Sequence, residues 1–287
     1  GQDEAVQRLI EQVVFAQATG QRFPDKLLVG PAGVGKSTIA RRIGKLLGHE
    51  TLFFSGPDVR RPADLIARLA QAKRLDDAPA DKPVIVQPVL LFIDEVHGIA
   101  GPVATSLLSA MDDSRVTSID GRLYDFNLAI FLLATTDPGR LTEAFQSRPN
   151  KTWLRPYSLH ELAGILWLHG KDCLDGAELA RDACYEIAAR NQCNPRRSVR
   201  QLSQTLVPHF FSRAMAEREG HPSLTETAAW LTRERIAAFY DEQGVDPNGL
   251  DDVALRFLRY LKHQRTASEP TLRQALGLAH QRDFVEV

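Results

Sequence analysis

Two short motifs contain most of the side chains that could carry chemistry in this sequence. The first motif, GPAGVGKST at residues 30–38, has the spacing G-x-x-x-x-G-K-S. Its glycines allow backbone N–H groups to close around phosphate oxygens, and Lys36 can reach the terminal phosphates. An apolar run precedes the motif and a helical pattern follows it, as a phosphate-binding loop requires. The candidate nucleotide contacts are Gly30, Pro31, Gly33, Val34, Gly35, Lys36, Ser37 and Thr38.

The second motif, VLLFIDEVH at residues 89–97, ends an apolar run in two carboxylates. Asp94 is the predicted partner of the Ser37 hydroxyl in holding Mg²⁺, and Glu95 is predicted to orient or deprotonate the attacking water. Adjacent acidic residues after a strand often only cap the next helix. A phosphate-binding loop earlier in the chain favours the catalytic interpretation, with ATP and Mg²⁺ as cofactors.

A further polar position closes the apolar run at residues 128–136, LAIFLLATT. A short hydroxyl side chain there could lie between the two motifs and contact the γ-phosphate or the attacking water. The alternative is an ordinary pair of threonines at a strand end. We favour Thr136 as the contact.

Two residues from the later part of the chain are also candidates for nucleotide binding. Arg196, in NPRRSVRQL at residues 194–202, could contact the phosphates from a second domain. A solvated helix start is the alternative, and Arg197 and Arg200 are rivals for the role. Tyr157 could pack on the adenine ring or only fill a hinge between two domains.

The elements that must position these residues follow from the hydrophobic pattern. Continuous apolar strands that alternate with amphipathic helices indicate an α/β fold with a parallel sheet covered on both faces. A hairpin is predicted where residues 115–126 alternate around Asp120-Gly121, and a polar, proline-broken loop at residues 75–88. The predicted buried strands lie at residues 26–30, 89–95 and 128–136, and residues 51–57 are predicted as a strand followed by a turn.

The character of the chain changes after about residue 155, where strand patterns stop and amphipathic helices follow. This change predicts three domains: a nucleotide-binding core at residues 1–154, an all-α lid at 155–244 and a small helical unit at 245–287. Residues 225–244 are predicted as a single helix. Residues 244–249, GVDPNG, are predicted as a loop-rich linker.

Composition narrows the class of protein. The 287 residues include 44% hydrophobic and 25% charged side chains, which is ordinary for a globular protein. The three cysteines show no CxxC spacing and favour a reduced, cytoplasmic protein. The sequence contains no run of about 18 apolar residues, so no membrane-spanning helix is predicted.

The formal net charge of −1 means that any surface for nucleic acid must be local. Cationic residues are dense near the end of the chain, where they could contact phosphates or form a solvated helix face diluted by acidic neighbours. They are Arg259, Lys262, His263, Arg265, Arg273, His280 and Arg282.

Taken together, the motifs resemble those of AAA+ ATPases, and more narrowly of the RuvB family of Holliday-junction branch-migration motors. The resemblance implies a core, a helical lid and a C-terminal winged helix. It also implies a hexameric ring that hydrolyses ATP at its subunit interfaces and acts on DNA. The matching segments, in family order, are GQDEAV, LLVGPAGVGKSTIA, SGPDVRRPADL, LFIDEVH, LLSAMDD, LLATTDPGRLT, SRPN, NPRRSVRQL and GVDPNGLDDVALRFL.

The resemblance also implies a role for each candidate residue. It implies Walker A for Lys36 and Ser37, Walker B for Asp94 and Glu95, sensor 1 for Thr136, sensor 2 for Arg196 and an adenine neighbour for Tyr157. The pair Ser147-Arg148 looks like an arginine motif that acts on the neighbouring subunit's nucleotide. An ordinary exposed arginine is the alternative, and Arg140 is the nearer competitor.

Two departures indicate a divergent member of the family. FQSRPN at residues 145–150 lacks the family's second arginine and its RFG turn, and the hairpin 115–126 is shorter than the family's, which docks RuvA. A protein partner at this hairpin is therefore an open hypothesis. The leading functional hypothesis is a DNA motor. The rivals are an ATP-dependent switch or remodeller of a protein partner, and a nucleotide-holding scaffold with negligible hydrolysis, against which intact Lys36 and Glu95 argue.

Overall fold

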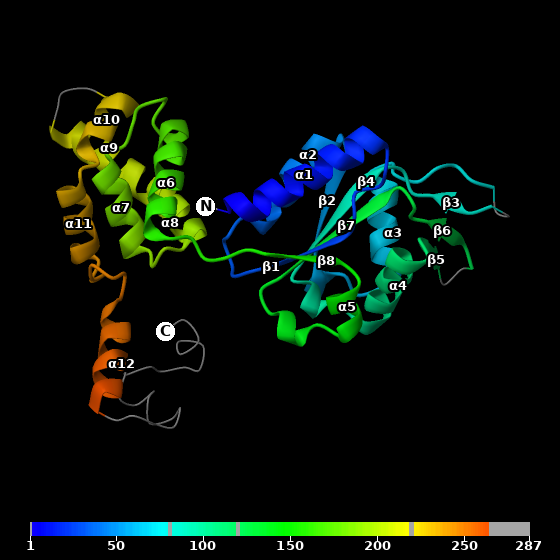
Figure 1. Ribbon diagram of the computed structural model, residues 1–287. Coiled ribbons are helices and arrows are strands. Elements are labelled where there is room, and N and C mark those ends of the chain that lie inside the picture. Colours follow the sequence, from blue (N-terminus) through cyan, green and yellow to red (C-terminus); the bar gives the residue numbers. More distant parts are fainter. Residues whose placement is uncertain (1, 80–81, 119–120, 218–220, 264–287) are drawn as a thin grey trace. The chain divides into compact units, whose positions relative to one another are not determined.

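Figure 1 shows the computed structural model of the chain. The structure describes residues 2–79, 82–118, 121–217 and 221–263. The chain divides into two compact units, Gln2–Pro156 and the segment that begins at Tyr157. Most of the predicted third unit, including the cationic residues from Arg265 onward, lies outside the described residues.

The first unit is built on a five-stranded sheet whose neighbouring strands are all parallel. The three central strands are apolar and buried, because helices cover both faces of the sheet. The predicted α/β class with a parallel sheet is thus confirmed. The strand order is β2 (Glu50–Ser55), β4 (Val89–Asp94), β7 (Ala129–Thr135), β1 (Lys26–Val29) and β8 (Asn150–Trp153).

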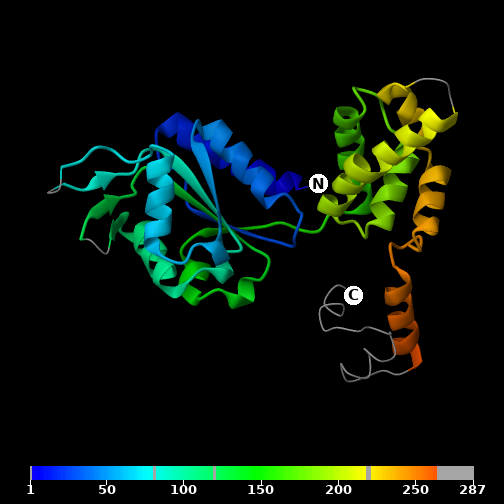
Figure 2. The same ribbon diagram turned by 180° about the vertical axis from the view of Figure 1, so that it is seen from behind.

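Two pairs of helices cover the sheet (Figures 1 and 2). Alternate residues of the central strands, such as Leu91 and Phe131, pack with the helices of one face into one apolar cluster. The helices of that face are α3 (Pro62–Gln71) and α4 (Gly101–Asp112). The helices of the opposite face are α1 (Asp3–Thr19) and α2 (Lys36–Leu47).

Asp25 holds the start of β1 between its neighbours. Its Oδ1 accepts hydrogen bonds from the backbone N–H of Phe131 at 2.8 Å and from Arg22 at 2.6 Å. Its backbone carbonyl accepts from the N–H of Asn150 in β8. Burial raises the pKa of the Asp25 carboxyl, while the charge of Arg22 acts in the opposite direction.

A second, three-stranded sheet lies beside the first at the edge of the unit. The predicted hairpin is present as β5 (Arg115–Thr117) and β6 (Leu123–Asp125), which pair antiparallel. The prediction of a loop throughout residues 75–88 is wrong. This segment contains the short strand β3 (Val84–Ile85), which pairs with β6. The prolines and acidic residues of this segment make its sequence look like a loop, although Val84 and Val86 are buried.

The second unit is helical in the part that the structure describes. The segment 225–244, predicted as one helix, contains two, because the Thr232 side chain caps a new helix after Leu231. The region after Arg196 is likewise interrupted, by a π-helical turn at Leu202–Leu206. The helices are α6 (Leu159–Cys173), α7 (Arg181–Arg190), α8 (Pro195–Gln201), α9 (Val207–Glu217), α10 (Leu224–Trp230), α11 (Arg233–Glu242) and α12 (Asp252–His263).

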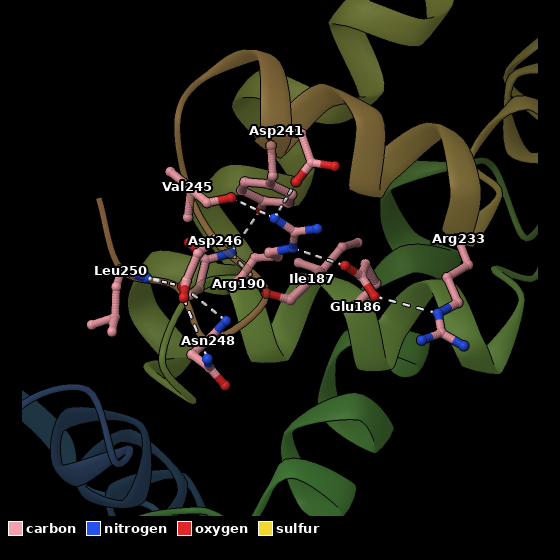
Figure 3. A network of polar contacts seen from close by, with 11 residues as sticks. Glu186, Ile187, Arg190, Arg233, Asp241, Val245, Asp246, Asn248 and Leu250 are labelled. Carbon is pink, nitrogen blue, oxygen red and sulfur yellow. Dashed lines mark hydrogen bonds and ion pairs between the residues drawn. The ribbon is translucent and has the colours of Figure 1, made fainter. Parts of the chain in front are cut away.

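Arg190 is the centre of a polar network in this unit (Figure 3). Its side chain is only 3% exposed and pairs with Glu186 at 2.8 Å and Asp241 at 2.7 Å. It also donates to the carbonyl of Val245, in the segment predicted as a linker. Burial raises the pKa of the neighbouring Tyr240 to about 12.

The segment after α11, predicted as a loop-rich linker, is a hydrogen-bonded turn. The Asp246 carboxylate accepts from the backbone N–H of Asn248 at 2.9 Å and of Leu250 at 2.7 Å. These hydrogen bonds hold the pKa of Asp246 below its usual value. The Gln192 side chain donates to the carbonyl of Gly249 at 3.1 Å, so the turn is fastened to the end of α7.

Each helix in the described ranges is either too short or too polar to cross a lipid bilayer.

Candidate nucleotide-binding site

The phosphate-binding loop connects the buried strand β1 to the helix α2. Gly33 and Gly35 have φ angles of 82° and 98°, which side chains with a Cβ rarely adopt. Gly35 is the N-cap of α2 and provides no side-chain cap, so the first N–H groups of the helix face the loop. Lys36 is buried, and its Nζ donates to the carbonyls of Gly30 at 2.8 Å and Pro31 at 3.0 Å.

The strand register brings the two motifs to the same edge of the sheet. In β7, which lies between β1 and β4, Thr135 is level with Val29 of β1 and Leu133 with Ile93 of β4. The backbone N–H of Gly30 donates to the carbonyl of Thr135 at 3.2 Å. Because parallel strands end together, the loop, Thr136 and the two carboxylates meet where ligands of open α/β sheets bind.

Glu95 has an unusual backbone conformation. Its φ and ψ angles are 48° and 49°, in the left-handed region that residues other than glycine seldom occupy. Gly56 lies against it so closely that an added Cβ would be 2.3 Å from the Glu95 carbonyl oxygen. This strain turns the chain sharply at the end of β4 and is typical of functional sites.

Two hydrogen bonds and one close ring nitrogen converge on one oxygen of the Glu95 carboxylate. Thr136 donates to Oε2 through its backbone N–H at 3.2 Å and through Oγ1 at 2.9 Å. The Nδ1 atom of His97 lies 3.2 Å from the same oxygen. The other oxygen, Oε1, has no hydrogen-bond partner among the described residues. The carboxylate is therefore oriented through Oε2, while Oε1 remains able to accept a proton from water.

His97 is a site residue that the sequence analysis did not identify. Its Nδ1 also lies 2.9 Å from Oγ1 of the buried Thr135, which accepts from the backbone N–H of Asp137 at 3.1 Å. We assign the tautomer with its proton on Nδ1, because both oxygens near this nitrogen, Oγ1 of Thr135 and Oε2 of Glu95, can accept a hydrogen bond. The sequence offered one indication of this role, since His97 lies two residues after Glu95. In the structure His97 lies on the turn Val96–Gly98.

Ser37 and Asp94 are the side chains suited to a magnesium ion. Ser37 is the second residue of α2 and Asp94 is the last residue of β4, and both are half-buried. Hydroxyl and carboxylate oxygens are the ligands that Mg²⁺ prefers, together with water and phosphate oxygens. The described residues contain no group of three or more His, Cys, Asp and Glu side chains that could hold a metal alone.

Arg148 caps the short helix α5 (Glu143–Ser147) and is exposed. Its Nε donates to Oδ1 of Asp112 at 2.7 Å and lies 2.6 Å from Oδ2. Within the described chain, none of its hydrogen bonds or ion pairs reaches a residue of the nucleotide site. Its competitor Arg140 is exposed on the turn Pro138–Arg140.

The two other predicted nucleotide contacts belong to the second unit. Arg196 is exposed in the first turn of α8. Tyr157 is half-buried and packs against the apolar cluster of the helices. For Tyr157, this packing is compatible with the alternative role of filling a hinge between two domains. The nucleotide contacts of Arg196 and Tyr157 stay predictions.

Comparison with known proteins identifies the family. A family model described as the ATPase family associated with various cellular activities (AAA) matches residues 26–157. A RuvB subunit of the Holliday junction branch migration complex from Salinibacter ruber is 31% identical over 90% of this chain and 69% of its own length. The chain belongs to the RuvB family. A RuvB from Myxococcus xanthus is 30% identical over the same shares of both chains.

The fold of this chain is also similar to that of a solved RuvB structure. The RuvB Holliday junction branch migration motor of Thermotoga maritima superimposes with a TM-score of 0.71 at 24% identity, covering 97% of this chain and 83% of that one. This RuvB family member is accordingly an AAA+ protein that binds nucleotide and hydrolyses ATP. The sheet edge brings together the phosphate-binding loop, the hydrogen-bonded Glu95 carboxylate and the hydroxyl of Thr136.

Proposed function

We propose that this protein is an ATP-driven motor that works as a ring, most simply a hexamer, and moves branched DNA. The observation that carries the proposal is the oriented Glu95 carboxylate beside a phosphate-binding loop, in a chain whose relatives are branch-migration subunits. A second observation supports assembly. Arg148, the predicted finger, bonds to Asp112 and not to its own nucleotide site.

The proposed hydrolysis uses groups from two subunits. Backbone N–H groups of the loop hold the phosphates, and Lys36 exchanges its carbonyl partners for phosphate oxygens. Oε1 of Glu95 accepts a proton from the attacking water, while Thr136 and His97 hold Oε2. Arg148 of the neighbour supplies positive charge to the transferring phosphoryl group. A Mg²⁺ ion held by Ser37 and Asp94 would polarise the phosphates and offset their charge.

The DNA contact is assigned to the C-terminal region. On α12, Arg256, Arg259 and Lys262 are exposed and could approach phosphates. Such contacts are independent of sequence, as a motor that travels along DNA requires. The free thiols of the three cysteines are compatible with the proposed cytoplasmic location.

The proposal is tested by measuring ATP turnover with a four-way junction, a linear duplex, a single strand and no DNA. We expect DNA to raise turnover several-fold, most of all the junction, and the effect to weaken from about 50 to about 200 mM salt. Glu95→Gln should still bind ATP and lose turnover. If no DNA changes turnover or binds at low salt, the remodeller hypothesis replaces the motor.

A further inference from the structure

The Asp112–Arg148 pair joins the end of α4 to the end of α5. The two residues are 36 positions apart, and the contact uses a single nitrogen of the guanidinium, Nε. The two terminal Nη groups of Arg148 have no partner among the described residues. The side chain is thus anchored near its middle, while its far end is left available.

Folding stability does not account for this pair. The side chains are 36% and 41% exposed, and exposed ion pairs of this kind contribute little to stability. The backbone around Arg148 is held by the buried Phe145 of α5 and by β8, which pairs with β1, so the exposed side chain is the part that is left to be oriented. An arginine there would sample many rotamers unless another group selected one.

We propose that Asp112 is a positioning residue that holds the Arg148 side chain in the orientation needed by the neighbouring subunit. This inference rests on the proposed function, in which Arg148 acts on the neighbour's nucleotide. A guanidinium has five N–H donors in a planar fork, and the four on the Nη groups suit phosphate oxygens. Fixing Nε beforehand removes most of the entropy loss that would otherwise accompany the contact.

The same pair could instead hold Arg148 back from the neighbour. The carboxylate would then compete with the phosphate, and removing it would raise turnover. The bonding pattern favours positioning, because Asp112 occupies Nε and leaves the phosphate-binding end of the guanidinium open. The sign of the change in turnover separates the two roles.

The first test replaces Asp112 and follows turnover, ATP affinity and thermal unfolding of the assembled protein with DNA. We expect Asp112→Ala to lower kcat about fivefold to thirtyfold, with KM for ATP and the unfolding temperature almost unchanged. Asp112→Asn keeps an acceptor for Nε and should retain intermediate activity. Asp113→Ala is the matched control, because this neighbour has the same charge, is exposed and has no side-chain partner among the described residues.

The second test mixes inactive subunits. Lys36→Ala mixed with Arg148→Ala should regain activity, because each mixed ring contains some junctions with an intact site and an intact arginine. Asp112→Ala should behave like Arg148→Ala: adding Lys36→Ala subunits should raise its activity above simple dilution. Adding Arg148→Ala subunits should not.

The outcomes distinguish the two proposals. If Lys36→Ala and Arg148→Ala fail to complement, the action of Arg148 on a neighbour is wrong. If they complement but Asp112→Ala has normal or raised kcat, only the positioning role is wrong. A loss of kcat in Asp112→Ala that Lys36→Ala subunits cannot relieve also overturns the positioning role.

Discussion

The two oxygens of the Glu95 carboxylate have different surroundings, and this difference explains how one side chain can be both fixed and reactive. Oε2 accepts two hydrogen bonds from Thr136 and lies close to His97, while Oε1 has no hydrogen-bond partner among the described residues. The left-handed backbone of Glu95 adds strain that sets the direction of the side chain. The surrounding side chains and backbone therefore orient the Glu95 carboxylate.

The hydroxyl of Thr136 can be tested apart from its backbone. Thr136→Val keeps the shape and the N–H donor but removes Oγ1, so we expect kcat to fall about tenfold to a hundredfold with ATP binding retained. Thr136→Ser keeps the hydroxyl and should be close to the parent protein. Steady-state turnover and binding of a fluorescent ATP analogue measure the two quantities. Equal kcat values for the two variants would show that the hydroxyl has no role.

Among the elements, the end of α7 combines structural roles that the sequence did not reveal. Arg190 connects α7 to α11 and to the turn that leads to α12 (Figure 3). A buried guanidinium with paired carboxylates gives little net stability compared with an apolar core, but removing one partner leaves charge uncompensated. The network thus makes the turn part of the helical unit.

We expect Arg190→Met to lower the free energy of unfolding by about 2–4 kcal/mol, because Glu186 is only 12% exposed and loses its close partner. Chemical denaturation followed by tryptophan fluorescence would measure the change. Arg233→Met is the matched control. Arg233 is 60% exposed and contacts the same glutamate at 3.3 Å, so its loss should cost less than about 1 kcal/mol. Equal losses in both variants would contradict the special role of Arg190.

At the level of the whole protein, turnover should depend on assembly. One chain holds the loop, Glu95 and Thr136, while Arg148 is bonded to Asp112 on the surface of its own chain. In the proposed mechanism, a chain on its own would lack the positive charge that Arg148 of a neighbour supplies to the transferring phosphate.

We accordingly expect ATP turnover per chain to rise steeply with protein concentration, over the range in which sedimentation velocity shows rings to form. Arg148→Ala should assemble over the same range and remain inactive, about 10³-fold or more below the parent. A monomer with full turnover would contradict assembly of the active site across two chains.

Short-range patterns were sufficient to predict the α/β class and to place the phosphate-binding loop, the two carboxylates and Thr136 at strand ends, while the roles of these side chains stay predictions. These features depend on residues close together in the chain: glycines that permit the loop, and strands whose parallel ends must meet. The strand β8 was missed because it is short and polar, and β3 was missed because it has only two residues; both gain their order from neighbouring strands.

The partners of individual side chains were decided by the tertiary structure. His97 meets Thr135 across 38 residues, Arg148 meets Asp112 across 36 and Arg190 meets Asp241 across 51. A local sequence pattern cannot predict contacts between residues so far apart in the chain, because each contact depends on which strands are neighbours and where the helices end. The motifs predict which atoms can react, whereas the packing determines which oxygen of Glu95 is held and which nitrogens of Arg148 have no partner in the described part of the chain.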